Sequence, residues 1–229
     1  EQKSQITLFA DPTTPFEYGA YREQFTEPLQ TLIGNKIVFY GLKIAENYLD
    51  TLSLGFMTRN VDGHAWHTLS GYGYLTPVIY YLGWIGVGVA IAQLLRRRVI
   101  RQNSSALLLF LVVIGIAPAA ITVNAPHATR SLLFFWAWAV LASSAVDFGI
   151  KQLRTPMNRG IATVVISLII MASSLPYLNT LFRVYPTSIE LQAPLLSGFD
   201  TTVQAVANDQ TSKQVAIVDT RGFHYILTA

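Results

Sequence analysis

Four long apolar stretches constrain this chain more than any other feature of its sequence. They cover residues 76–95, 104–123, 131–150 and 160–180. The hydrocarbon core of a bilayer is about 30 Å thick, and roughly 20 helical residues are needed to cross it. Three of the stretches contain no charged side chain, and the remaining one carries only Asp147. The sequence therefore predicts a mainly α-helical, polytopic membrane protein with about four transmembrane helices.

Polar segments on either side of this region, 76–180, define the rest of the organisation. Residues 1–75 include an expected amphipathic helix from Lys36 to Leu54, whose charged side chains make it unsuitable as a membrane span. Residues 181–229 include an apolar run, Gln214–Thr220, that is typical of a buried strand, so we expect a small and incomplete α/β unit there. Because the N-terminus lacks the apolar core of a signal peptide, we expect the chain to be a fragment of a longer protein.

Basic residues in the connections predict how the chain crosses the membrane. The first connection, 96–101, holds four arginines, and the third, 151–159, holds three basic residues, whereas the second, 124–130, holds one. Lysine and arginine collect on the cytoplasmic side of membrane proteins. We therefore expect residues 1–75, 124–130 and 181–229 to share the outer face. Since most of the net charge of +3 comes from these short runs, it does not indicate nucleic-acid binding.

Asp62, His64 and His67 lie within six residues of one another, just before the first apolar stretch. Imidazole and carboxylate groups at this spacing suit a divalent metal ion. They equally suit contact with a substrate or a lipid phosphate. The alternative is an interfacial loop whose polar groups hydrogen-bond to one another and to lipid head groups.

His127 and Arg130 flank the start of the third apolar stretch. An arginine at the N-terminus of a helix offers several N–H donors to a phosphate, and the end of the helix adds more. A lipid-linked phosphate at the outer face would meet these groups. The alternative is an arginine that only anchors its helix at the membrane boundary.

Other residues in the apolar stretches are expected to have structural roles. Asp147 is expected to pair with Lys151, one helical turn later. The aromatic residues of 134–138 are expected to provide packing and lipid-facing surface. Small residues are expected to let neighbouring helices approach closely: Gly83, Gly86, Gly88, Ala137, Ala139, Ala142 and Ser143.

Two motifs resemble those of a known enzyme family. The first is a spaced series of residues ahead of the first apolar stretch: Asn47-Tyr48-Leu49, Leu52-Ser53, Phe56, Asn60, Asp62-Gly63, His67, Gly71 and Gly73. The second has the form Pro-His-x-x-Arg and spans residues Pro126–Arg130. In order and spacing, both resemble bacterial GT-C fold membrane glycosyltransferases of the protein-mannosyltransferase and aminoarabinose-transferase kind. The resemblance covers about residues 35–150.

The resemblance implies transfer of a sugar from a polyprenyl-phosphate carrier to an acceptor protein or glycolipid at the outer face of the bacterial inner membrane. It implies that His127 and Arg130 bind the lipid phosphate, and that Asp62, His64 and His67 orient the donor or the acceptor. Its catalytic acid is expected in a loop upstream of this sequence, so no catalytic residue is assigned. No cofactor is assigned either, with a divalent metal as the alternative.

Two other functions are considered beside the glycosyltransferase. The first is a non-catalytic scaffold or assembly subunit that binds a partner through its outer loops. The second is a small transporter, which is disfavoured because the apolar stretches lack the paired intramembrane charges of proton-coupled carriers. The polar candidate residues gather instead at one membrane face.

Overall fold

Helices make up most of the computed structural model, which describes residues 7–59, 69, 71–96, 104–123, 125–184 and 186. In chain order they are α1 (Thr14–Glu23), α2 (Glu27–Leu32), α3 (Lys36–Thr51), α4 (Leu54–Arg59), α5 (Pro77–Arg96), α6 (Ser104–Ala120), η3 (Thr129–Ser131), α7 (Leu132–Lys151), α8 (Pro156–Asn179) and the π-helical turn η4 (Thr180–Val184). Within these ranges no strand forms, which confirms the mainly helical class. The strand expected at 214–220 lies outside the described residues.

Three of the expected spans are confirmed as helices long and apolar enough to cross a membrane: Pro77–Arg96, Thr129–Lys151 and Pro156–Val184. The last of these differs in extent from the expected 160–180. It begins earlier, because the Thr155 hydroxyl accepts a hydrogen bond from the Asn158 N–H at 3.2 Å and caps the helix. It also continues through 181–184, which the sequence assigns to the tail.

The stretch expected as a fourth span, 104–123, forms the shorter apolar helix α6. At 1.5 Å per residue its 17 residues give a length of about 26 Å. The helix ends at Ala120, where Thr122 donates from both its backbone N–H and its hydroxyl to the Ala119 carbonyl. A fourth full-length span therefore stays a prediction.

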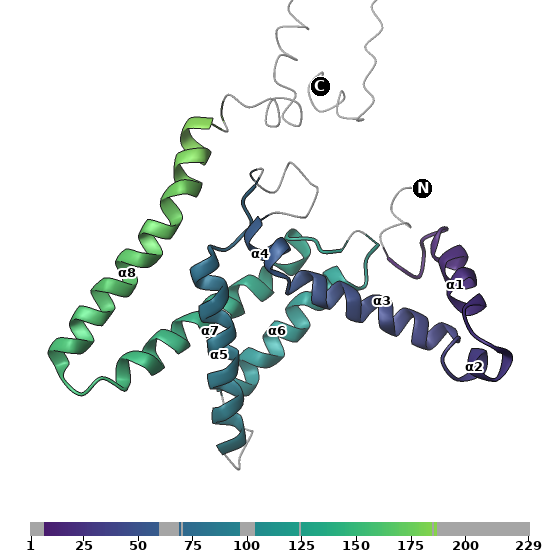
Figure 1. The fold of residues 1–229 in the computed structure, drawn as a ribbon, viewed down its shortest axis with the longest axis horizontal. Helices are drawn as coiled ribbons and strands as arrows, with labels where there is room; N and C mark the ends of the chain where they lie inside the picture. The colour runs from purple at the N-terminus through teal and green to yellow at the C-terminus, as the bar shows by residue number, and fades with distance from the viewer. Residues whose placement is uncertain are drawn as a thin grey trace, which may run out of the picture.

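Helices α5 to α8 alternate in direction, so the last residues of α5 and of α7 lie at the same end of the bundle (Figure 1). We call this the basic end, because it carries Arg96, Lys151, Arg154 and Arg159. The expected pair is present there, with Lys151 Nζ 2.6 Å from a carboxylate oxygen of Asp147. The opposite end, which carries α4 and the turn between α6 and α7, is called the His127 end.

Helix α7 forms the centre of the molecule through its contacts with α5 and α6. Phe134 and Trp138 are completely buried, whereas Trp136 is 69% exposed, as expected for a helix with both packing and lipid-facing aromatic residues. The contact with α5 is close: a Cβ atom added to Gly86 would lie 2.0 Å from the Leu141 carbonyl oxygen. The expected role of Gly86 in close helix packing is thereby confirmed.

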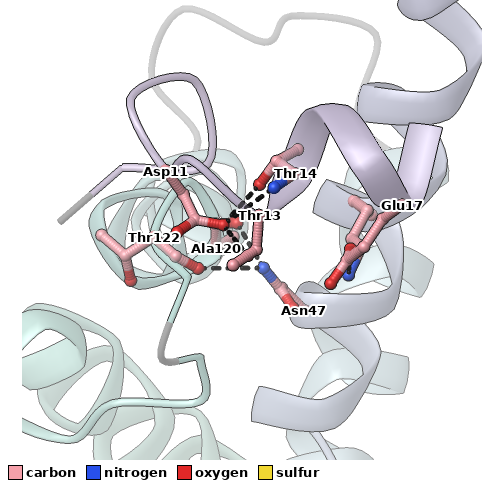
Figure 2. Close-up of polar contacts among 8 residues, drawn as sticks. Asp11, Thr13, Thr14, Glu17, Asn47, Ala120 and Thr122 are labelled. Atoms are coloured by element: carbon pink, nitrogen blue, oxygen red, sulfur yellow. Dashed lines mark hydrogen bonds and ion pairs between the residues drawn. The ribbon is translucent and has the colours of Figure 1, made fainter. Parts of the chain in front are cut away.

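Helix α3 is attached to α6 by two polar side chains. The Asn47 amide donates to the carbonyls of Ala120 at 2.8 Å and Thr122 at 3.3 Å, as Figure 2 shows. The Tyr48 hydroxyl donates to the Val113 carbonyl at 2.9 Å. These contacts lie on either side of Pro118, whose missing N–H interrupts the hydrogen bonding of the helix. Together they bind the last turns of α6 to α3.

The segment before α1 holds the end of α6 from another direction. The Leu8 N–H donates to the Ile121 carbonyl at 3.0 Å. The Asp11 carboxylate caps α1 by accepting hydrogen bonds from the Thr13 and Thr14 hydroxyls and from the Thr14 N–H (Figure 2). These bonds, led by the one from the Thr13 hydroxyl, lower the pKa of Asp11 below 3.8.

Candidate functional site

The turn between α6 and α7 places His127 and Arg130 at one end of the bundle. The Ala125–Pro126 peptide bond is cis, and His127 is buried with only 9% of its surface exposed. The Thr129 hydroxyl lies 3.1 Å from His127 Nδ1 and fixes the orientation of the imidazole ring. The short helix η3 then leads directly into α7. His127 and Arg130 of the Pro-His-x-x-Arg motif thus lie on one turn at the start of α7.

Arg130 carries the most informative polar group of this turn. Its side chain is half-buried, and within the described part of the chain its Nη1 atom is buried without a hydrogen-bond partner. A buried donor left unsatisfied costs about 1–3 kcal/mol, and a charged one costs more. The positive end of the α7 dipole adds to the positive potential at the same place. An anion at this position would accept a hydrogen bond from Arg130 Nη1 and would be stabilised by the positive potential.

Within the described residues, two further buried polar atoms lack a hydrogen-bond partner: Ser131 Oγ at the end of η3 and Trp138 Nε1 on α7. The Trp138 indole nitrogen belongs to the interface with α5, because it would lie 2.0 Å from a Cβ atom at Gly83. Ser131 is completely buried and follows Arg130 directly in the chain. We therefore include Ser131, but not Trp138, in the candidate site.

A cavity of about 530 Å³ lies at the same end, between the start of α5 and the end of α8. We call it the hydroxyl cavity, after its side-chain hydroxyl groups: Thr58, Tyr72, Tyr74, Thr76, Ser173, Ser174 and Tyr177. Its wall at Gly73 is packed tightly against α4, since a Cβ atom there would lie 2.4 Å from the Met57 carbonyl oxygen. The backbone at this side of the cavity is therefore held close to α4.

The remaining predicted site residues, Asp62, His64 and His67, lie outside the described residues. Their proximity to His127 and Arg130 stays a prediction. Among the residues that the structure describes, no group of three or more histidine, aspartate or glutamate side chains has the arrangement needed to hold a metal ion.

Sequence reasoning did not identify the role of Asn47 and Tyr48 in positioning this site. Both belong to the first motif, but only the structure shows that they hold the end of α6, from which the His127 turn departs. Burial also raises the pKa of the Tyr48 hydroxyl above 10.0, which keeps the hydroxyl protonated as a donor. Membership of that motif was the available signal, because Asn47 is one of several polar residues in its helix, beside Lys43, Glu46 and Asp50.

Comparisons with known proteins add no relative to this description: no protein-family model matches the chain, and neither does any curated protein or solved structure. The function is therefore argued from the geometry and chemistry of the site.

Proposed function

We propose that the chain is part of a membrane glycosyltransferase that transfers a sugar from a polyprenyl-phosphate donor to an acceptor at the outer face of the membrane. The observation that carries this proposal is the buried, unpartnered Nη1 atom of Arg130 at the boundary end of a membrane-length helix. Its placement suits the phosphate of a lipid, because the lipid tail lies in the bilayer while the phosphate lies at the boundary.

The chemistry follows from the charge that develops during transfer. The acceptor hydroxyl attacks the anomeric carbon, the bond from that carbon to the phosphate oxygen breaks, and the electron pair leaves with the lipid phosphate. The acceptor proton passes to a base outside the residues assigned here. Arg130 would stabilise the departing phosphate by donating hydrogen bonds to it. His127, whose ring is oriented by Thr129, would help to hold this turn in the conformation that binds the phosphate.

The orientation of the chain also supports the proposal. Basic residues of membrane proteins collect on the cytoplasmic side, so the basic end would face the cytoplasm. The His127 end would then face outward, together with the hydroxyl cavity. We propose the bacterial inner membrane as the location, on the strength of the two motifs.

Substitution of Arg130 in the native protein tests the phosphate role. Arg130→Gln removes the charge, and we expect it to lower kcat/KM for a synthetic polyprenyl-phosphate sugar by about 10- to 100-fold, the value of a charged hydrogen bond. Arg130→Lys should retain part of the activity. The matched control is Arg154→Gln, which changes an exposed arginine at the basic end. Unchanged transfer by Arg130→Gln in proteoliposomes would rule out this role.

A non-catalytic scaffold is the second candidate, and one observation favours it. Helix α3 exposes apolar side chains away from the bundle, with Ile37 86% and Leu49 69% exposed. A face of this kind suits a protein partner or a membrane surface. If the native protein shows no transfer with any polyprenyl-phosphate sugar and co-purifies with a partner through α3, the scaffold is the better description.

A further inference from the structure

Three cavities follow α8 along its length, and they share lining residues. The hydroxyl cavity shares Ile79 with a second cavity of about 400 Å³ between α5, α7 and α8. A third cavity, of about 510 Å³, continues toward the basic end. The second and third cavities have four lining residues in common: Leu82, Val146, Ile150 and Ile166. The three therefore form one series.

The hydroxyl cavity has the chemistry of a site for an uncharged, polyhydroxylated group. Hydroxyl oxygens and tyrosine rings line it, and among the residues that the structure describes no charged side chain lines it. The rings of Tyr72 and Tyr177 meet edge to face with centroids 5.8 Å apart, and the Thr180 hydroxyl donates to the Tyr72 hydroxyl at 3.3 Å. The hydroxyls of Thr58, Ser173 and Ser174 donate to carbonyls of their own helices, so a neutral sugar would gain hydrogen bonds mainly by donating to these oxygens, together with contacts to the tyrosine rings. An anionic group would lose its hydration without gaining a positive partner among the described lining residues.

The second and third cavities have the chemistry of a site for hydrocarbon. The third is lined by apolar side chains and glycine. The second is lined mainly by apolar side chains, with hydroxyls from Ser143, Thr163 and Ser167. Those of Ser143 and Thr163 donate to carbonyls of their own helices at 2.9 Å. Asp147, also in its lining, is paired with Lys151. We call these two the apolar cavities.

The surroundings of α8 determine what occupies this series. Helix α8 contains no buried residue, and Figure 1 shows it leaning away from α5 and α7. Since α8 is long and apolar enough to cross a membrane, its exposed apolar side chains would face hydrocarbon, which favours an occupant from the bilayer. From Ala162 to Tyr177 the lining advances by 15 positions along α8, or about 22 Å at 1.5 Å per residue, which is most of one hydrocarbon core.

We propose that α8, together with α5 and α7, binds a membrane glycolipid with an uncharged sugar head group. The sugar lies in the hydroxyl cavity, and the hydrocarbon chains lie in the two apolar cavities. Binding of this lipid does not depend on the function proposed above. Its role as the acceptor of the transferred sugar does rest on that function, and it would select a lipid in place of a protein as the acceptor.

Photo-crosslinking of defined lipids tests the site directly. The native protein is placed in nanodiscs that contain monoglucosyl diacylglycerol with a diazirine in one acyl chain, and the labelled peptides are mapped by mass spectrometry. Phosphatidylglycerol with the same labelled chain measures non-selective contact. We expect the glycolipid to label the cavity-lining peptides about fivefold more strongly, the equivalent of one net neutral hydrogen bond. Equal labelling by the two lipids would overturn the proposal.

Two pairs of variants test where on the protein the glycolipid binds. Ser174→Phe places a ring in the hydroxyl cavity, whereas Leu175→Phe changes the next residue, which does not line it. Gly149→Leu fills one apolar cavity, whereas Gly160→Leu makes the same change outside the three cavities; an added Cβ meets nothing within 4 Å at either glycine. We expect the first member of each pair to reduce glycolipid labelling to the phosphatidylglycerol level and the second to leave it unchanged. If the two members of a pair behave alike, the site is wrong.

The results also separate this inference from the proposed function. Selective glycolipid labelling with unimpaired transfer by Arg130→Gln would leave the lipid site standing and remove the phosphate role. Reduced transfer by Arg130→Gln with unselective labelling would remove only the lipid site.

Discussion

At the scale of single residues, Asn47 joins two parts of the chain that are 73 positions apart, and its amide is buried. Asn47→Ala would leave the Ala120 and Thr122 carbonyls without this donor, so we expect a loss of about 1–3 kcal/mol in the free energy of unfolding. Circular dichroism during thermal unfolding in detergent measures the change. Asn158→Ala, in an exposed part of α8, is the control and should leave the midpoint unchanged. Equal midpoints for both variants would show that the Asn47 contacts do not stabilise the fold.

The neighbouring residue, Tyr48, makes the contact between α3 and α6 sensitive to pH through its hydrogen bond to Val113. Its pKa is raised above 10.0 by burial, so its stabilising effect is complete below pH 10 and is lost as the pH rises through the higher folded-state pKa. As the pH rises above 10, we expect the thermal midpoint of the unmodified protein to decrease, and the midpoint of Tyr48→Phe to decrease less. Tyrosinate absorbance, compared between the two proteins, should place Tyr48 at the upper end of the tyrosine titration. A Tyr48 signal below pH 10 would contradict the prediction.

At the scale of helices, the contact between α5 and α7 depends on the absence of a side chain at Gly86. Gly86→Ala would bring a Cβ atom 2.0 Å from the Leu141 carbonyl oxygen, so the two helices must separate. We expect the loss of packing to lower the free energy of unfolding by about 1–3 kcal/mol. Gly88→Ala on the same helix meets nothing within 4 Å and should be neutral or stabilising, by up to about 1 kcal/mol. Denaturation of the two variants in parallel tests this difference.

The helices also differ in how well a sequence pattern predicts their features. Long apolar runs predicted four transmembrane helices, of which three are confirmed as membrane-length helices. A four-residue spacing predicted the Asp147–Lys151 pair. The helix ends were less predictable, because they depend on local hydrogen bonds such as those of Thr122 and Thr155. The expected role of Gly88 in close packing is wrong for the part of the chain that the structure describes, because a Cβ atom added there meets nothing within 4 Å.

At the scale of the whole molecule, the sequence placed His127 and Arg130 at one end but could not show how that end is built. Hydrogen bonds from Asn47 to the end of α6, and the burial of His127, arise only when distant segments pack together. The hydroxyl cavity could not be predicted either, because its serines and tyrosines come from segments about 100 residues apart. Hydrophobic periodicity contains no information about such pairings.

The lack of buried residues in α8 has a consequence for how the molecule responds to its surroundings. A helix held by extensive packing keeps its tilt, but α8 has few such constraints. Its 24 residues extend about 36 Å at 1.5 Å per residue, which exceeds a hydrocarbon core of about 30 Å. Because a hydrophobic stretch longer than the local hydrocarbon thickness can be accommodated by tilting, we expect the angle of α8, and with it the width of the cavities beside it, to respond to mismatch. Bilayer thickness would then be a physical variable that changes lipid access to this protein.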